Sequence, residues 1–367
     1  MAHEREDLTR IKVQPLAVRR SKHAFEAIRV DPQAPPPPAG DLAPKIEIVA
    51  ERIRGARASG ASVVLAFGAH LVKNGLGRVV EELMEAGWIT HLATNGAGVI
   101  HDWEYAFLGR SEEDVRSHVA EGRFGCWDET GRCTLLAVLT GALAGMGYGE
   151  SIGRFVLDGG CEIPRREDLW HAVADACETG NPALLPAQTE LLRSLERFEL
   201  PEGFLRVEHR NPENSLTAAA CRLGVPLTVH PGIGYDIVYT HPMANGAAMG
   251  RAAGIDFAIL VRAVGQMGKE GVLLSVGSAV MAPQVFEKAV SIANNLRRQE
   301  GAGPLTPFIA VNDLAEIDWD WSRGEPPSEH PAYYIRFCKS FSRMGGEMVY
   351  LGGDNRTFLQ NIHSLLA

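Results

Sequence analysis

An acid–histidine cluster directly follows a glycine-rich turn in this sequence. The stretch HLATNGAGVIHDWEY (91–105) ends an apolar run and then places His101, Asp102 and Glu104 within four residues. An imidazole near a carboxylate can take up or release a proton close to neutral pH, so these three are candidate catalytic residues. The competing interpretation is structural, because acids in the first turn of a helix stabilise the positive end of its dipole.

A second group contains Asp236 and His241, five residues apart in YDIVYTHP, with His230 at the end of the preceding apolar run. We interpret His241 as the preferred general base, oriented by Asp236, with His101 as the other candidate base. A structural pair at a helix start is the alternative. A metal site could also be drawn from His230, Asp236 and His241, but their spacing matches no recognised ligand pattern, so no metal is predicted.

Six short apolar runs must supply the elements that position these side chains. They are β-branched, and most lead into a segment with helical spacing. Continuous apolarity indicates strands buried on both faces, and strand–helix alternation indicates a parallel sheet. The sequence therefore predicts an α/β fold with a doubly wound, mostly parallel sheet of six or more strands and helices on both faces. The runs are SVVLAFG (62–68), THLATN (90–95), PLTVH (226–230), GVLLSVG (271–277), PFIAVND (307–313) and EMVYLGG (347–353).

The chain is expected to consist of an N-terminal arm over 1–45 and a single α/β domain over 46–367. The arm contains the proline run PQAPPPPAG (32–40), which favours an extended linker or an arm over a neighbouring subunit. A helical insertion is predicted over about 110–200, because 134–148 is small and apolar and 165–198 is amphipathic.

Glycine and polar residues collect where the predicted strands end. Ligands of open parallel sheets bind beyond the carboxyl ends of the strands. Glycines there let the backbone approach a ligand, a following helix favours phosphate, and acids suit ribose hydroxyls. A nucleotide-sized ligand is therefore favoured, although each turn alone could be glycine-rich for steric reasons and no GxGxxG fingerprint follows the first strand. The candidate cofactor-binding residues are Gly68, Ala69, His70, Asn74, Asn95, Gly96, Ala97, Gly98, Gly277, Ser278, Asp313, Asp354 and Asn355.

Composition argues against several classes of function. The net charge of −9 gives no electrostatic support for general nucleic-acid binding. No run of ~18 apolar residues is present, so no membrane partner is expected. The N-terminal stretch MAHEREDLTRIKVQ lacks the apolar core of a signal peptide, and six cysteines in so long a chain do not suggest a disulfide framework. The expected compartment is the cytoplasm.

Several of these stretches resemble the deoxyhypusine synthase family, over about 46 to 363. VVLAFGAHLVKNGL and ATNGAGVIHD are similar to the turns after the family's first two strands. VNDLAEIDWDWSRGEPPSEHPAYY resembles its N-T-A-Q-E-F-D segment, and EMVYLGGDNRTF its last strand with a cofactor-contacting aspartate. The resemblance implies an NAD cofactor and a homotetramer. It implies NAD contacts at Asn74 or His70, Thr94, Gly96, Gly98, Asp313, Asp318 and Asp354, and substrate contacts at Glu329 and Tyr333.

Two departures from that family bear on the reaction. Ile335 stands where the family has its imine-forming lysine, and Met281 stands in the segment that holds its catalytic histidine. A covalent amine carrier needs a lysine that can lose its proton, so the chain is not expected to be a true deoxyhypusine synthase. Lys73 or Lys339 could replace the missing lysine, and the alternative for both is a solvated surface charge.

A second resemblance, to the LOR/SDH group of the same NAD-binding fold, needs no such lysine. His101-Asp102-Trp103-Glu104 is similar to the H-D-x-E segment of that group, and VYLGGDNRTFLQNI to its last strand and helix.

The favoured function is that of an NAD-dependent enzyme that oxidises or transfers an amine, amino-acid or polyamine-type substrate. Asp102, Glu104, Asp236 and Glu329 are the candidate partners of a cationic substrate. A non-catalytic nucleotide-binding or scaffold protein of the same fold is the alternative, because both family catalytic residues are replaced. A metal-assisted hydrolase is a third interpretation.

Overall fold

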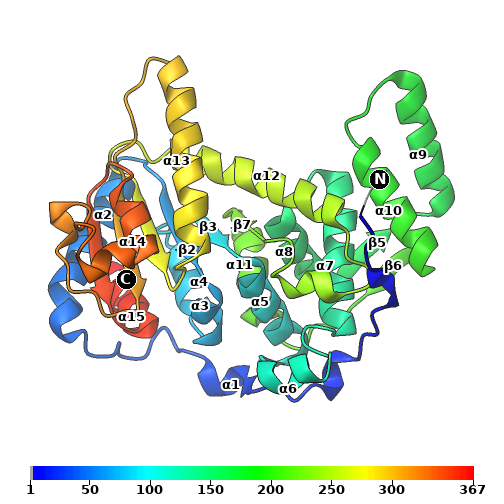
Figure 1. Ribbon diagram of the computed structural model, residues 1–367, viewed down its shortest axis with the longest axis horizontal. Coiled ribbons are helices and arrows are strands. Elements are labelled where there is room, and N and C mark those ends of the chain that lie inside the picture. The colour runs from blue at the N-terminus through cyan, green and yellow to red at the C-terminus, as the bar shows by residue number, and fades with distance from the viewer. Residues whose placement is uncertain (1–2) are drawn as a thin grey trace. The chain divides into compact units, whose positions relative to one another are not determined.

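The computed structural model describes residues 3–367 and separates them into two compact units. The first unit contains residues up to 27, 100–218 and 231–255. The second unit contains residues 28–99, 219–230 and 256–367. Figure 1 traces the chain through both.

The second unit is built on a six-stranded sheet in which all neighbouring strands are parallel. Each of the six predicted apolar runs forms one of its strands, so the predicted α/β fold is confirmed. Their interiors are buried because helices cover both faces, which explains the absence of an alternating pattern. The strands are β2 Val63–Phe67, β3 His91–Thr94, β7 Leu227–Val229, β8 Val272–Val276, β9 Phe308–Asp313 and β10 Met348–Gly352.

The strand order creates a switch point between β2 and β8. The order across the sheet is β10-β9-β8-β2-β3-β7, so the chain moves outward from β2 to β7 and then returns to the other side of β2. Phe67 at the end of β2 is level with Thr94 of β3 and Val276 of β8. The carboxyl ends of the central strands therefore form one edge, from which the two halves of the sheet diverge.

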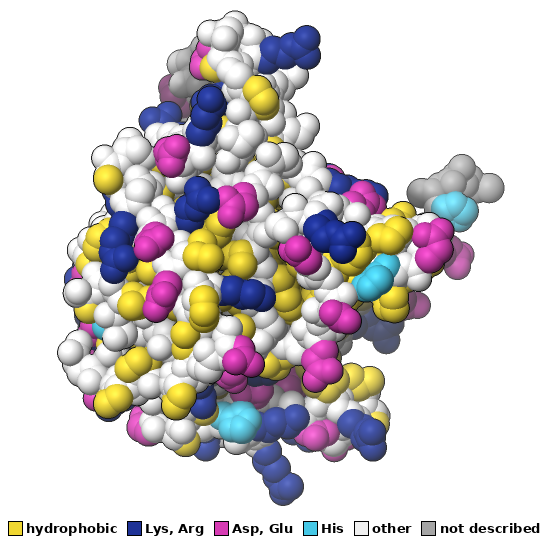
Figure 2. Space-filling view, turned by 90° about the vertical axis from the view of Figure 1, so that its left-hand side faces the viewer, with side chains coloured by type: hydrophobic (Ala, Val, Ile, Leu, Met, Phe, Trp, Pro, Cys, Tyr) yellow, Lys and Arg dark blue, Asp and Glu magenta, His cyan; other side chains and the backbone are white. Residues whose placement is uncertain are grey.

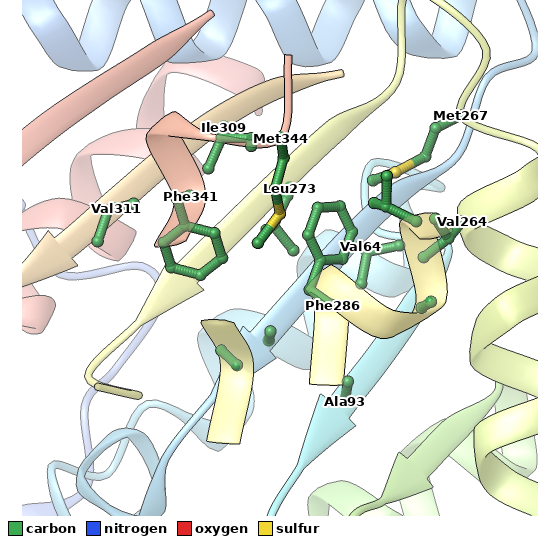
Figure 3. Close-up of a cluster of buried hydrophobic side chains, with 14 of the residues drawn as sticks. Val64, Ala93, Val264, Met267, Leu273, Phe286, Ile309, Val311, Phe341 and Met344 are labelled. Atoms are coloured by element: carbon green, nitrogen blue, oxygen red, sulfur yellow. The ribbon is translucent and has the colours of Figure 1, made fainter. Parts of the chain in front are cut away.

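Helices pack on both faces of this sheet. On one face, Phe286 and Phe341 pack into an apolar cluster with Val64, Leu273 and Ile309 (Figure 3). On the other face, α2 (Ala43–Ala58) contacts β2, β8 and β10, and α15 (Asn355–Leu366) contacts β9. Full burial of each such side chain contributes roughly 1.5–3 kcal/mol. The helices are α2 Ala43–Ala58, α3 Ala69–Lys73, α4 Gly77–Glu85, α13 Met281–Gln299, α14 Arg336–Ser342 and α15 Asn355–Leu366, with 3-10 turns η3 Gly40–Leu42, η7 Trp321–Arg323 and η8 Pro331–Tyr334.

The first unit is mainly helical, as predicted for about 110–200. Two short antiparallel ribbons, β1 with β4 and β5 with β6, accompany the helices. Its helices are α6 Val115–Ala120, α7 Asp128–Gly141, α8 Tyr148–Asp158, α9 Arg166–Thr179 and α10 Leu185–Phe198. Its strands are β1 His23–Ala24, β4 Arg110–Ser111, β5 Gly160–Ile163 and β6 Gly203–Arg206. Its 3-10 turns are η1 Leu8–Arg10, η2 Leu16–Val18, η4 Ala142–Ala144, η5 Pro212–Asn214 and η6 Ile237–Thr240.

The unit boundaries fall within or beside α1 Phe25–Ile28, α5 Gly96–Leu108, α11 Leu216–Leu223 and α12 Gly246–Gly265. Residues of the predicted arm occur in both units, with Leu16, Arg19 and Phe25 buried in the first. Compact clusters are not by themselves separate domains, so the boundaries drawn at 45 and 46–367 stay a prediction.

Charges of both signs are interspersed on the face that Figure 2 shows, with apolar side chains between them. Among residues 3–367, no single helix has the length and apolarity to cross a membrane, and one bent pair, Asp128–Ala144 with Tyr148–Asp158, meets those criteria jointly.

Candidate functional site

A recess of about 160 Å³ opens at the carboxyl edge of the sheet in the second unit. It lies beyond the ends of β8, β9 and β10 and beside the segment that follows β2. Six of the predicted cofactor-binding residues line it, which are His70, Asn74, Gly277, Asp313, Asp354 and Asn355. Asn312, Leu314 and Gly353 also line it and were absent from the predicted set.

Close packing of two strand ends shapes the edge at the switch point. A Cβ atom on Gly68 would lie 2.2 Å from the carbonyl oxygen of Gly277, and the Gly68 amide donates to Val276 at 3.2 Å. Gly277 itself has a φ of 56°, which favours glycine. Glycine at position 68 is therefore required by β2–β8 packing, whatever binds above it.

Two aspartates give the recess its charge. One oxygen of Asp313 accepts from the Ala315 amide at 3.1 Å, and one oxygen of Asp354 accepts from the Arg356 amide at 2.7 Å. Asp354 is thereby the N-cap of α15. Each carboxylate keeps its second oxygen for a ligand, and both are acceptors of hydroxyl or ammonium hydrogens.

Three amide side chains form the polar wall of the recess. Asn74 donates to the side-chain oxygen of Asn355 at 2.6 Å, which ties the segment after β2 to the start of α15. Asn312 donates to the carbonyls of Leu351 and Gly353, both at 3.0 Å. Its Oδ1 is buried and has no hydrogen-bond partner among the described residues. A buried acceptor without a donor is costly, so this atom suits an N–H or O–H group of a ligand.

The turn after β3 is held by its own side chains. Thr94 Oγ1 donates to the Phe67 carbonyl at 3.0 Å, and Asn95 Oδ1 accepts from the Gly98 amide at 2.9 Å. A Cβ on Gly98 would lie 2.2 Å from Thr94 Oγ1, so a side chain is excluded there. These contacts explain the local sequence without a ligand.

The remaining predicted cofactor contacts do not line the recess, so they stay predictions. Gly96 and Ala97 begin α5, Ala69 begins α3, and Ser278 Oγ accepts from the Ala282 amide at 3.2 Å near the start of α13. Asp318 is exposed.

In the first unit, Asp102 holds the start of α11. Its carboxylate accepts from the amides of Leu216 at 2.7 Å and Thr217 at 3.1 Å, and from the hydroxyls of Ser215 and Thr217, both at 2.8 Å. Burial raises the pKa of Asp102, whereas these four donors favour its charged form. Asp102 is in the second turn of α5, not the first, so it does not serve the dipole of its own helix.

Glu104 forms a buried, two-pronged ion pair with Arg19. The Arg19 Nη1 and Nη2 atoms lie 2.8 and 2.6 Å from the two carboxylate oxygens, and both residues are buried. Glu104 also accepts from the hydroxyls of Thr130, at 2.9 Å, and Ser111. Burial alone would raise the pKa of Glu104, but the Arg19 guanidinium holds it below its usual range. Neighbouring His101 has its Nδ1 atom 2.7 Å from Ser111 Oγ.

The predicted pairing of His241 with Asp236 is wrong. His241 Nε2 faces Asp128 Oδ1 at 3.6 Å, and Nδ1 accepts from the Met243 amide at 3.1 Å. The imidazole lies against Gly131 of α7, where a Cβ would come within 2.5 Å of the ring. His241 and Arg132 together lower the pKa of Asp128 to about 2. The sequence offered no sign of this partner, because Asp128 is 113 residues away.

Asp236 is instead a nearly isolated buried carboxyl. It is 6% exposed, and it accepts from the Gly232 amide at 2.8 Å. Burial raises its pKa to about 6. A group that titrates close to neutral pH inside the protein is a suitable general acid or base.

Replacing Asp236 by asparagine is expected to stabilise the fold above pH 6 by about 3 kcal/mol. Because the folded-state pKa of about 6 exceeds the ordinary 3.8, the carboxyl destabilises the fold progressively as pH rises between these values. Asparagine keeps the acceptor for Gly232 and removes the charge. Urea unfolding at several pH values measures this, with equal stabilities expected below pH 3.8 and an unchanged difference across pH counting against it.

His230 belongs to a buried histidine pair in the second unit. Its Nε2 lies 3.1 Å from Thr228 Oγ1, and Nε2 of His91 lies 3.0 Å from the same oxygen. Burial lowers the pKa of His230 to about 4 and that of His91 to about 3, so both rings are neutral at pH 7. Within residues 3–367, no three His, Cys, Asp or Glu side chains are arranged to hold a metal.

The substrate contacts implied by the first resemblance are spread over an exposed segment. Glu329 is exposed and accepts from Ser328 Oγ at 2.8 Å. Lys339 Nζ lies 3.6 Å from the centroid of the Tyr333 ring, in a cation–π contact. A role for Lys339 or Glu329 in catalysis stays a prediction.

Comparison with known proteins gives structural likenesses only. No family model matches the chain, and no curated protein sequence does. The complex of AgrE with ornithine and NAD+ is 12% identical, with a TM-score of 0.44, and covers 91% of this chain and 34% of its own. ArgZ, an arginine dihydrolase of cyanobacteria, is 13% identical, with a TM-score of 0.41, over 88% of this chain and 32% of its own. A conserved putative LOR/SDH protein from Methanococcus maripaludis S2 is 11% identical, with a TM-score of 0.42, and the match covers 92% of this chain and 71% of that protein.

The chain thus spans about a third of the length of AgrE and ArgZ. The LOR/SDH description coincides with the second resemblance found in the sequence. The resemblance to deoxyhypusine synthase stays a prediction, and no family membership follows from identities of 11–13%.

Proposed function

We propose that the second unit binds NAD at the carboxyl edge of its sheet and that the chain is an NAD-dependent enzyme acting on an amine or amino acid. The observation that carries the proposal is the strand order. Numbered along the chain, the sheet reads 3-2-1-4-5-6, the order of doubly wound dinucleotide-binding folds, in which the ligand lies at the switch point. The recess opens on that edge and is lined by polar side chains from the end of β9 and from the segments that follow β10 and β2.

The recess suits a nucleoside better than a phosphate. Asp313 and Asp354 would repel a phosphate but accept hydrogen bonds from ribose hydroxyls. The start of α15 is already capped by Asp354, so its positive end is satisfied. Leu314, at 73% exposure, gives an apolar surface for a base beside the two carboxylates.

The recess would hold only part of the cofactor. Its 160 Å³ is below the roughly 300–1,000 Å³ of most small-molecule sites. The rest of the dinucleotide would extend along the edge toward Gly96, where α5, a helix of 13 residues, begins. The first turn of such a helix stabilises phosphate, and its cap, Asn95, carries no negative charge that would repel one.

The amine or amino-acid substrate is proposed from the sequence, in which Glu329 of the second unit is a candidate partner of a cationic group. AgrE was crystallised with ornithine and NAD+, ligands of the proposed classes, but the proposal rests on this chain's own residues.

Two measurements test the proposal separately. Calorimetric titration of the purified chain with NAD is expected to show binding, and the absence of heat at ~1 mM NAD would contradict the cofactor assignment. Incubation with NAD and a panel of ornithine, lysine, arginine and spermidine is then expected to produce reduced nicotinamide.

Binding without turnover on a broad amine panel would favour the non-catalytic alternative. That alternative draws on Ile335 and Met281, which occupy the positions of the catalytic lysine and histidine in the deoxyhypusine synthase family.

A further inference from the structure

A second and larger cavity lies wholly within the first unit. It has a volume of about 480 Å³ and shares no lining residue with the recess on the sheet. Four segments enclose it, namely η2, the end of α5, the start of α7 and the stretch that contains β6. Its lining residues are Ala17, Phe107, Leu108, Glu129, Arg132, Cys133, Leu205, Arg206, Val207, Glu208 and Arg210.

Part of the lining of this cavity is apolar. Phe107, Leu108, Leu205 and Val207 line it, and Cys133 of α7 is buried at 2% exposure. Such a surface favours a hydrocarbon or aromatic group of a ligand over water.

The lining also carries charges of both signs, and the Arg206 guanidinium lies over the Phe204 ring, 5.9 Å from its centroid. Arg206, Glu208 and Arg210 are exposed, and none of them forms an ion pair with another residue in the described part of the chain. Arg132 differs, because its guanidinium lies 2.9 Å from Asp128, which neutralises it. Glu129 uses one oxygen to accept from the Leu16 amide at 2.6 Å, which leaves the other for a ligand.

We propose that this cavity binds an amino acid with an aromatic or branched apolar side chain. The α-carboxylate would pair with the guanidinium groups of Arg206 and Arg210, which match a carboxylate in geometry. The α-ammonium group would pair with Glu208 and Glu129, and the side chain would contact the apolar part of the lining. A ligand with only a negative charge would leave the two glutamates without a positive partner. A ligand with only a positive charge would leave the two arginines without a negative partner. The cavity therefore selects a zwitterion, and this site goes beyond the proposed cofactor function.

The test is calorimetric titration of the full chain with L-phenylalanine and L-leucine. Two probes that each lack one charge are compared, 3-phenylpropanoate without the ammonium group and phenethylamine without the carboxylate. L-phenylalanine is expected to bind at least about 10-fold more tightly than either. No binding of either amino acid at ~10 mM, or equal affinity for all the aromatic probes, would overturn the proposal.

Matched variants locate the site. Arg206→Ala combined with Arg210→Ala is expected to weaken L-phenylalanine binding at least about 10-fold, and so is Glu208→Gln. Because these residues are exposed and make no ion pair in the described structure, the variants should fold, which circular dichroism verifies. Arg116→Ala and Glu213→Gln, which are exposed in the same unit and do not line the cavity, should leave affinity unchanged. Equal effects of control and cavity variants would place the ligand elsewhere and refute the proposal.

Discussion

Replacing Arg19 by methionine is expected to lower the free energy of unfolding by about 3–5 kcal/mol. The guanidinium is buried and bonds to both oxygens of Glu104, which is itself 1% exposed. Methionine fills similar space without the charge, so a carboxylate is left in the interior with only the hydroxyls of Thr130 and Ser111 as donors. Urea unfolding followed by circular dichroism measures the difference.

This loss should depend on pH in a defined direction. In the native chain the pKa of Glu104 is below its ordinary 4.5, so the pair stabilises the fold above that pH and loses this effect as pH falls. In the variant, burial dominates and the pKa of Glu104 rises, so the unpaired carboxyl destabilises the fold most at neutral pH. The difference in the free energy of unfolding between the native chain and Arg19→Met is therefore expected to become smaller below pH 4.5.

Arg20→Met provides the matched control, since Arg20 is the next residue and is exposed. It should change stability by less than about 0.5 kcal/mol. If Arg19→Met behaved like Arg20→Met, the ion pair would not hold the N-terminal segment, and Glu104 would again be open to a role in catalysis.

Replacing Asp313 and Asp354 together by asparagine is expected to reduce the preference for NAD over NADP by roughly 100-fold, which corresponds to about 2.7 kcal/mol. In the native chain, the 2′-phosphate of NADP would face two carboxylates in the recess. Asparagine keeps the acceptors for the amides of Ala315 and Arg356 and removes the negative charge, so the local backbone should be retained.

Competitive titration of NAD and NADP on the native and double-variant proteins gives the ratio. Asp318→Asn is the control, because the family resemblance implies an NAD contact at Asp318, whereas the structure places Asp318 outside the lining of the recess. An unchanged ratio in the double variant, or a large change in Asp318→Asn alone, would show that the ribose does not lie between Asp313 and Asp354.

The sheet could be predicted from the sequence because its strands are local and strongly patterned. Each strand is a run of apolar, mostly β-branched residues, and burial on both faces keeps that run free of polar interruptions. The turn chemistry after each strand was also readable, and it correctly indicated His70, Asn74, Gly277, Asp313, Asp354 and Asn355 as lining residues of one edge.

The roles of the acid–histidine residues could not be read in the same way. Arg19 and Glu104 are 85 residues apart, and Asp102 reaches Ser215 across 113. No feature of the local sequence distinguishes a carboxylate that bonds to a distant helix from one that binds a substrate. His241 is the opposite case. Its proximity in sequence suggested Asp236 as the partner, but in the structure its partner is the distant Asp128.

The contact between Gly68 and the Gly277 carbonyl has a consequence for protein engineering. With only 2.2 Å between a new Cβ atom and the Gly277 carbonyl oxygen, even alanine at position 68 would force the backbone to shift where β2 and β8 end. Variants designed to change the specificity of the proposed nucleotide site should therefore keep glycine at positions 68 and 277. Variation is better placed at positions such as Leu314 after β9, which is 73% exposed.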